Sequence, residues 1–315
     1  MKLSLMIPTF NSAETIARTL GSVLAQSYRP LEVVVYDEAS KDETRAIVRR
    51  LLPAAPPEVE TRLMTAEANS GPVKAWRVPL HAVTGAWCAF VWADDVLDPA
   101  YSDQMMAGAR RAEAAGRKLV ACSGAVELGG APAKAYYAPD RGVISGVEFS
   151  LGMFMRRFPL TQICAVYETA AAREVFDRHI QFENPRGYDY TRYPYGHAVG
   201  YLSELAQLGG VELLGERLVT LVDSGSSMTR RGTHEHLWQM RWQYTFNQLR
   251  VWRWWVERGV PGAERLRRMG ERRLALCTLM LGGGGARLDP RNYLRGLGAY
   301  VDFRRHDYQT NKAAG

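Results

Sequence analysis

The sequence predicts an α/β protein: a mostly parallel, Rossmann-like sheet flanked by helices, followed by a helical C-terminal extension. Two apolar, β-prone runs at residues 2–7 and 31–36 flank a stretch over 13–26 whose apolar residues recur at helical spacing. Strands that are apolar at almost every position are typical of a sheet covered on both faces. Strands that alternate with helices through short links predict parallel pairing with right-handed crossovers.

The remaining elements of the first 125 residues continue this alternation. Ser12 is the expected N-cap of the first helix, and Ser40 with Glu43 predicts a capping box for a second helix that ends near Leu52. The elements expected next are a strand over 61–65, a helix over 73–83, a strand over 86–92, a helix over 101–115 and a strand over 119–124. This order is that of a parallel α/β sheet.

Beyond residue 125 the pattern is looser. A loop-rich segment over 129–146 precedes the expected helices, which lie over 168–179, 199–208, 235–258 and 263–281. We therefore expect a main domain over 1–224, made of halves 1–125 and 126–224, and a separate C-terminal region over 225–315.

Composition and charge limit the classes of function. The chain has 315 residues and a net charge of +7, and its composition excludes collagen, coiled coil and wholesale disorder. Its four cysteines are far apart and form no CxxC pair, which argues against a zinc site and a disulfide framework. The region over 229–315 is strongly basic but has no recognisable nucleic-acid motif, so we expect no nucleic-acid partner.

Acidic side chains follow two of the predicted strands. Asp37 and Glu38 follow the strand over 31–36, and Asp94 and Asp95 follow the strand over 86–92. In open α/β sheets, ligands bind beyond the carboxyl ends of the strands, so these ends are the expected site. Adjacent carboxylates suit a hard divalent cation, which keeps positions for waters and phosphates. The alternative is that Asp94 and Asp95 only cap a turn before Pro99.

Three motifs follow one another over residues 2–125. They are Leu3–Asn11 (LSLMIPTFN), Val33–Thr44 (VVVYDEASKDET) and Phe90–Asp95 (FVWADD). In this order and spacing they resemble family 2 glycosyltransferases, the GT-A enzymes that move a sugar from a nucleotide diphosphate sugar. The resemblance implies that 1–125 binds the nucleotide sugar, most simply a UDP-sugar, and that 126–224 binds the acceptor.

The resemblance also implies which residues contact the nucleoside. Pro8, Thr9 and Phe10 would line the base, and Asp37 would contact the base or the ribose. Glu38 stands where the family has a second aspartate, which leaves open which of the two acids contacts the base.

Other residues would hold the diphosphate end of the donor. Asn69 and Gly71 resemble the family's Asn-x-Gly turn near the ribose and phosphates, and Lys74 or Arg77 would contact the diphosphate. The remaining implied roles are Asp94 towards the ribose and metal, Asp95 on Mn²⁺ or Mg²⁺, and His234 as a further metal ligand.

The mechanism implied for the family is inverting, with a side-chain base that takes the proton of the acceptor hydroxyl. The family's acid before the helix over 199–208 is missing here, and His197 occupies the matching position. A histidine has an ordinary pKa of about 6.5, so its neutral form can accept a proton. Asp189 is the nearest upstream carboxylate and is the second candidate for the base.

Three readings of function follow from these features. The first is a transferase of glycan or polysaccharide assembly that acts on a glycan or lipid-linked acceptor. A nucleotidyltransferase-like enzyme, or a non-catalytic nucleotide-sugar-binding protein that has lost its base, are the alternatives.

The C-terminal region adds a question about partners. Residues 235–258 contain five of the eight tryptophans, beside many basic residues. Peripheral membrane contact, a homodimer through residues 235–281, and packing within the chain are all open. No segment reaches the roughly 20 apolar residues of a membrane span, so we expect a cytoplasmic protein, with any membrane contact at the inner face.

Overall fold

The computed structural model describes residues 1–128, 134–136, 141–155, 157–158, 161–180, 195–223 and 234–280. The chain divides into two compact units, which are described separately. The first unit comprises Met1–Pro194 and Tyr201–Ser227, and the second comprises Tyr195–Gly200 and Met228–Gly315. The division after Ser227 lies near the expected boundary, but the sequence did not predict that Tyr195–Gly200 belongs to the second unit.

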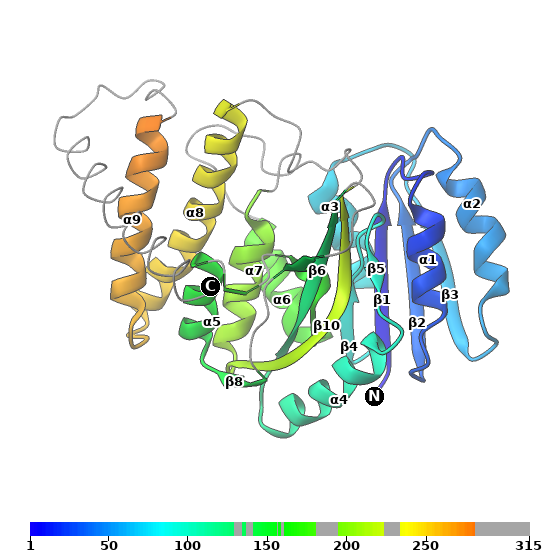
Figure 1. Cartoon of the computed structure of the whole chain (residues 1–315), viewed down its shortest axis with the longest axis horizontal. Helices are drawn as coiled ribbons and strands as arrows, with labels where there is room; N and C mark the ends of the chain where they lie inside the picture. Colours follow the sequence, from blue (N-terminus) through cyan, green and yellow to red (C-terminus); the bar gives the residue numbers. More distant parts are fainter. Residues whose placement is uncertain are drawn as a thin grey trace. The chain divides into compact units, whose positions relative to one another are not determined.

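The first unit contains the predicted α/β sheet (Figure 1). Its first half comprises β1 (Leu3–Thr9), α1 (Ile16–Leu24), β2 (Leu31–Asp37), α2 (Thr44–Leu51), the 3₁₀ turn η1 (Leu52–Ala54), β3 (Val59–Thr65), α3 (Pro72–Ala82), β4 (Trp87–Phe90), β5 (Val96–Leu97) and α4 (Tyr101–Ala114). Its second half comprises β6 (Leu119–Leu128), β7 (Lys134–Tyr136), β8 (Gly142–Ile144), α5 (Gly146–Phe154), η2 (Gln162–Cys164), β9 (Ala165–Glu168), α6 (Thr169–Ile180), α7 (His197–Gln207) and β10 (Val211–Asp223). The first turn of α7 belongs to the second unit.

The described strands form one sheet in the order β3-β2-β1-β4-β9-β6-β10-β5, with β7 beside β6 and β8 beside β10. β1 pairs in parallel with both β2 and β4, and β2 pairs in parallel with β3, which confirms the predicted parallel sheet. β9 runs antiparallel to both β4 and β6, so the second half of the sheet is mixed.

The core lies on both sides of the apolar strands β1 and β2. β1 and β2 are buried along their whole length, as their apolar runs predicted. Leu5, Ile7 and Val33 belong to the same core cluster as Ile16 and Leu20 of α1. In Figure 1, α1 and α2 lie side by side along β1 and β2. Each such buried side chain contributes about 1.5–3 kcal/mol of hydrophobic stabilisation.

The carboxyl ends of these strands meet at one edge of the sheet. Thr9, the last residue of β1, pairs in register with Asp37, the last residue of β2. The Val91 N–H donates to the Met6 carbonyl (2.8 Å), so the chain leaving β4 continues along β1 towards the same edge. The three sequence motifs therefore converge there.

The two capping predictions for the first helices are wrong. α1 begins at Ile16 with Thr15 as its N-cap, and Ser12 contributes only its carbonyl, which accepts from the Ile16 N–H (2.9 Å). α2 begins at Thr44, and the hydroxyl of Ser40 accepts from the backbone N–H of Asn11 (2.9 Å) in place of capping the helix. Both serines join the loops after β1 and β2, and that tertiary contact replaces the local cap.

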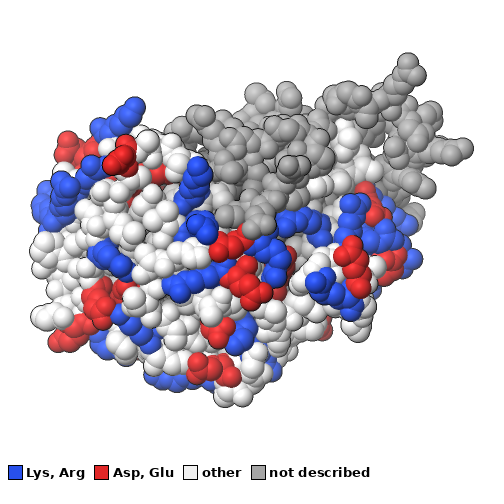
Figure 2. All heavy atoms as spheres, turned by 180° about the vertical axis from the view of Figure 1, so that it is seen from behind, with Lys and Arg blue, Asp and Glu red and all other residues white. Residues whose placement is uncertain are grey.

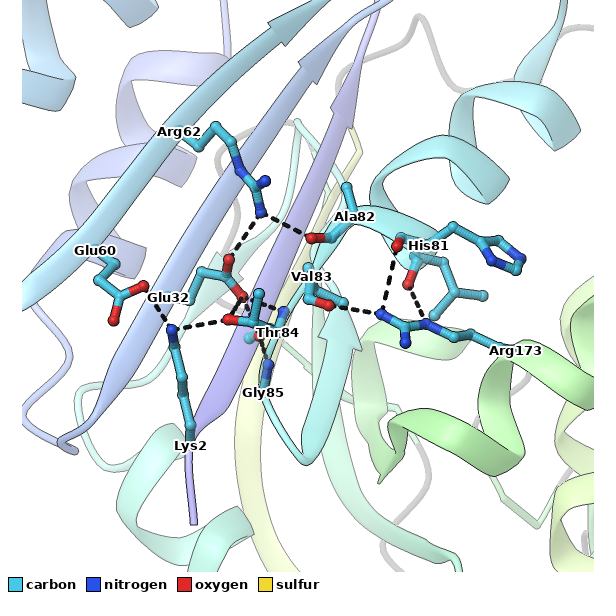
Figure 3. Close-up of polar contacts among 12 residues, drawn as sticks. Lys2, Glu32, Glu60, Arg62, His81, Ala82, Val83, Thr84, Gly85 and Arg173 are labelled. Atoms are coloured by element: carbon cyan, nitrogen blue, oxygen red, sulfur yellow. Dashed lines mark hydrogen bonds and ion pairs between the residues drawn. The ribbon is translucent and has the colours of Figure 1, made fainter.

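A buried polar cluster lies at the amino-terminal edge of the sheet (Figure 3). Glu32 of β2 accepts hydrogen bonds from Ser4 Oγ (2.5 Å), from the Thr84 N–H (2.8 Å) and from Arg62 Nη2 (2.8 Å). Burial raises the pKa of Glu32, but these hydrogen bonds and the neighbouring positive charges outweigh it and hold the pKa below its ordinary value. The cluster fixes the turn that leads into β4.

The second unit contains two long helices, α8 (His234–Glu257) and α9 (Ala263–Met280). They pack closely, because a Cβ at Gly270 of α9 would lie 2.9 Å from the indole of Trp252 on α8. Trp242 Nε1 donates to Thr278 Oγ1 (2.9 Å), and Trp242, Trp252 and Trp255 are buried. These three tryptophans therefore do not form an exposed aromatic surface.

Candidate nucleotide-sugar site

Two buried polar atoms mark the carboxyl edge of β1 and β2. Asp37 is 0% exposed and Thr9 is 4% exposed. Within the described parts of the chain, Asp37 Oδ1 and Thr9 Oγ1 have no hydrogen-bond partner. A buried polar atom without a partner costs about 1–3 kcal/mol, so two of them on paired residues indicate a site for a polar ligand.

The other oxygen of Asp37 is firmly held. Asp37 Oδ2 accepts from both Nε (2.9 Å) and Nη2 (2.7 Å) of Arg45, in the first turn of α2. The backbone N–H of Ser40 lies 3.3 Å from the same oxygen. These donors fix the rotation of the carboxylate and leave Oδ1 as its unpartnered oxygen.

The loops after β1 and β2 are tied together beside this carboxylate. Asn11 Oδ1 accepts from the Lys41 N–H (2.9 Å), opposite the bond from the Asn11 N–H to Ser40. Asn11 (φ 50°) and Ala39 (φ 58°) both have a left-handed backbone, which is strained for residues with a side chain. Strain of this kind gathers at ligand sites, where the surrounding structure enforces it.

Pro8 and Phe10 differ in exposure. Pro8 is buried within β1, whereas Phe10 is 41% exposed just after the strand. An exposed aromatic ring beside buried hydrogen-bonding atoms suits the face of a planar ligand.

Glu38 is buried and holds a turn. Its Oε1 accepts from the backbone N–H (2.8 Å) and the hydroxyl (3.1 Å) of Ser70, and its own N–H donates to the Thr9 carbonyl (2.9 Å). Asn69 Oδ1 accepts from the Gly71 N–H (3.2 Å), and Gly71 has φ 95° at the start of α3. The structure thus separates the two acids: Asp37 presents an unpartnered oxygen, while Glu38 positions the Asn69–Gly71 turn.

The two basic candidates on α3 lie in different surroundings. Arg77 Nε donates to Asp177 Oδ1 of α6 (2.8 Å), and His81 Nε2 contacts the same oxygen (3.1 Å). The prediction of Arg77 as a diphosphate contact therefore finds no support, because this guanidinium is engaged on α6. Lys74 is exposed in the first turn of α3, near the turn that Glu38 holds.

Asp94 and Asp95 follow β4 as predicted. Asp95 is 4% exposed, and its Oδ1 accepts from the Val222 N–H of β10 (3.0 Å). Burial, followed by the negative charge of Asp94, raises the pKa of Asp95 well above its ordinary value, against the lowering effect of the Val222 bond. Two crowded carboxylates at this edge are therefore unfavourable on their own.

This pair fits a divalent cation. No group of three or more His, Cys, Asp or Glu side chains in the described residues forms a complete metal site. Mg²⁺ needs only one or two carboxylates, because waters and substrate phosphates fill its other positions. A bound cation would also relieve the repulsion between Asp94 and Asp95.

His197 lies in the second unit, in surroundings unlike those of an accessible base. It is fully buried, and burial together with the charge of Arg250 lowers its pKa to about 3. Before it, Gly196 (φ 80°) would place a Cβ 2.6 Å from Tyr244 Cα, and Asn247 Nδ2 donates to the Tyr195 carbonyl (3.0 Å). The segment is thus packed tightly on α8, which argues against the prediction of His197 as the base.

Two further predictions fall where the structure gives no information. Asp189, and the side chain of His234 at the start of α8, lie outside the described residues. Both stay predictions from the sequence.

Two groups of this site were not predicted from the sequence. Arg45 was not singled out, although it stands in the first turn of the helix that follows Asp37. The Val222 N–H that holds Asp95 comes from β10, a strand far away in the sequence.

A mixed α/β sheet with acidic groups at the ends of β2 and β4 defines a protein of the GT-A type. Two solved structures match this fold along nearly the whole chain. S. aureus TarS 1-349 in complex with UDP-GlcNAc matches at a TM-score of 0.61 and 17% identity, over 97% of this chain and 81% of that one. The mannosyltransferase PcManGT from Pyrobaculum calidifontis, in complex with GDP-Man and Mn²⁺, matches at 0.52 and 17% identity, over 99% and 84%.

The sequence of the first half matches a known family. Residues 4–129 match the model of glycosyl transferase family 2. The succinoglycan biosynthesis protein ExoO of Rhizobium meliloti is 36% identical over 117 residues, which are 37% of this chain and 31% of that protein.

A second relative is named as a UDP-Glc:α-D-GlcNAc-diphosphoundecaprenol β-1,3-glucosyltransferase, WfgD of Escherichia coli. It is 31% identical over 94 residues, which are 30% of this chain and 35% of that protein. The chain thus spans about a third of the length of these relatives.

Proposed function

We propose that this protein is a glycosyltransferase that moves a sugar from a UDP-sugar to an acceptor hydroxyl with inversion. The observation that carries the proposal is the unpartnered, buried Asp37 Oδ1 at the sheet edge towards which the chain runs from β4 to Asp94 and Asp95. That arrangement offers one group for a nucleoside and another for a diphosphate with its cation. The family of residues 4–129 supports the same reading.

The chemistry of Asp37 favours particular bases. An ionised carboxylate oxygen accepts hydrogen bonds and donates none. Uracil and guanine carry a ring N–H that can donate to it, whereas the matching ring nitrogen of cytosine or adenine only accepts. The hydroxyl of Thr9 can donate or accept, so it satisfies a neighbouring carbonyl of the base. We therefore propose UDP as the nucleotide that the site prefers and GDP as the second candidate.

At the other end of the donor, Asp94 and Asp95 would hold Mn²⁺ or Mg²⁺. Such an ion supplies positive charge that neutralises the departing nucleoside diphosphate. The chain itself supplies the buried Asp95, fixed by the Val222 N–H, and the exposed Lys74, whose ammonium suits a phosphate oxygen. Glu38 positions the Asn69–Gly71 turn through its bonds from Ser70.

Nucleotide binding by the purified protein tests the proposal. Thermal melts with UDP, GDP, CDP and ADP, each with and without Mn²⁺, should show stabilisation by UDP that increases with Mn²⁺. A ligand at 100 times its Kd that binds only the folded protein adds about 2.7 kcal/mol of stability. Failure of both UDP and GDP to stabilise the protein would contradict the proposal, and turnover of UDP-sugars to UDP would separate an enzyme from a binding protein.

For the general base that takes the proton of the acceptor hydroxyl, we propose Asp189 ahead of His197. A base works best with a pKa near the working pH, and the pKa of about 3 for the buried His197 is far below it. Asp189→Asn should lower turnover at least a hundredfold, with donor affinity unchanged. His197→Asn should chiefly lower the melting temperature, because it changes a buried, packed side chain.

Initial rates and UDP affinity of both variants decide between them. If His197→Asn loses turnover at an unchanged melting temperature while Asp189→Asn stays active, the histidine is the base after all.

We propose a glycan or lipid-linked acceptor, as the activity in the name of WfgD suggests by analogy. None of the helices in the described residues is both long and apolar enough to cross a bilayer.

We also propose peripheral contact with anionic lipid at the inner face of the membrane. Three exposed arginines of α9 share one helix face and suit such contact: Arg265, Arg268 and Arg272. Lysine and arginine side chains are interspersed with acidic ones on the surface in Figure 2, so we expect such binding to be weak and salt-sensitive. Co-sedimentation with anionic vesicles at low and high salt tests it.

A further inference from the structure

We propose that Arg45 is a positioning residue that sets the selectivity for the nucleobase by fixing the rotation of the Asp37 carboxylate. This inference rests on the proposed function, since it requires a nucleoside diphosphate at Asp37. It gives Arg45, described above only as a donor to Asp37 Oδ2, a role in base selectivity.

The first support is the geometry of the pair. Both contacts of the Arg45 guanidinium go to one oxygen, with Nε at 2.9 Å and Nη2 at 2.7 Å from Asp37 Oδ2. The Asp37 side chain is 0% exposed, and its Oδ1 has no hydrogen-bond partner in the described part of the chain. The pair thus leaves one buried acceptor, Oδ1, unused by the described residues.

The second support is the anchoring of Arg45 itself. Thr44, the residue before it, is buried, and its hydroxyl accepts from the Ser12 N–H of the loop after β1 (2.7 Å). Asp42 accepts from the N–H groups of Ala13 (3.0 Å) and Thr44 (3.0 Å). The start of α2 is thus fixed to the loop that follows β1, so the guanidinium reaches Asp37 from a defined position.

The consequence concerns discrimination between bases. With Oδ2 held by Arg45, only Oδ1 is available to a ligand. Oδ1 accepts a hydrogen bond from a ring N–H, whereas a ring nitrogen with a lone pair is repelled by it and binds less well. Without Arg45 the carboxylate can turn, so that Oδ2 or a water meets the base in several geometries. We therefore expect the preference for UDP over CDP to depend on Arg45, even though Arg45 does not touch the base.

The test compares Arg45→Met, which keeps much of the length of the side chain but has no donor, with Arg45→Lys and a control. Arg49→Met is the matched control, because Arg49 lies one turn further along α2 and is exposed. Isothermal titration of each protein with UDP and with CDP, in the presence of Mn²⁺, gives the ratio of the two dissociation constants. Melting temperatures are measured on the same samples.

We expect Arg45→Met to reduce the UDP/CDP preference at least tenfold, Arg45→Lys to reduce it about threefold, and Arg49→Met to leave it unchanged. An unchanged ratio in Arg45→Met and Arg45→Lys, whatever the change in melting temperature, would show a purely structural ion pair and overturn the inference. Should Arg45→Met fail to fold, the ratio for Arg45→Lys decides alone. Wild-type protein that binds neither nucleotide would instead overturn the proposed function.

Discussion

Asp95→Asn is expected to lower turnover at least tenfold, which corresponds to about 1.4 kcal/mol in activation free energy, while the fold stays intact. The asparagine keeps an Oδ1 that can accept from the Val222 N–H, so the contact to β10 survives. Its amide lacks the negative charge that makes a carboxylate a good ligand for Mn²⁺ or Mg²⁺. Initial rates over a titration of either metal measure the loss.

A matched control variant and a stability measurement test whether the loss of turnover in Asp95→Asn comes from the metal site. Asp98→Asn changes an exposed carboxylate three residues further along, whose Oδ1 accepts from the Ala100 N–H (2.8 Å), a bond that an amide oxygen also makes. We expect its turnover to be unchanged. Without metal, Asp95→Asn should melt no lower than wild type, because the repulsion between Asp94 and Asp95 is gone. Normal turnover and normal metal dependence in Asp95→Asn would refute the assignment of this pair as the metal site.

The first half of the fold was predictable because local pattern and burial agree there. β1 and β2 are apolar at most positions and buried throughout, and the apolar residues of α1 recur at helical spacing. The alternation of strands with helices predicts that the strands pair in parallel. The ends of the predicted strands then located Asp37, Asp94 and Asp95, because strand ends can be read directly from where an apolar run stops.

The second half of the sheet gave weaker signals. β10 was missed because Gly215, Glu216 and Arg217 interrupt its apolar run, at the place where its register with β6 shifts. β9 has only four residues, and α5 contains two glycines, which lower helix propensity. The capping box of α5, formed by Ser145 and Glu148, was nevertheless visible in the sequence and was overlooked.

Individual side-chain roles were less predictable than strand ends. The sequence left open whether Asp37 or Glu38 contacts the base. The distinction depends on Arg45 and Ser70, which reach these acids across turns of the folded chain. The burial of His197 likewise depends on α8, whose place beside residues 195–200 cannot be deduced from a local pattern. Contacts of this kind are tertiary, so the spacing of apolar residues in the sequence does not predict them.

Glu32→Ala is expected to lower the free energy of unfolding by about 3 kcal/mol, because the change leaves several donors at the amino-terminal edge of the sheet without an acceptor. Ser4, Thr84 and Arg62 all donate to this one buried carboxylate. Glu60→Ala is the matched control, since Glu60 of β3 pairs in register with Glu32 but its side chain is 66% exposed in its ion pair with Lys2. An exposed pair of this kind contributes under about 1 kcal/mol.

The stabilisation by Glu32 should also depend on pH in a defined direction. Its pKa is lowered in the folded protein, so the folded state favours the ionised form more than the unfolded state does. The contribution is therefore complete above the unfolded value of about 4.3 and is lost as the pH falls through the folded pKa. Urea denaturation at pH 7 and at successively lower pH should show the gap between wild type and Glu32→Gln narrowing below about pH 4.3. A gap that stays constant over that range would mean that packing, and not the charge of Glu32, stabilises this edge of the sheet.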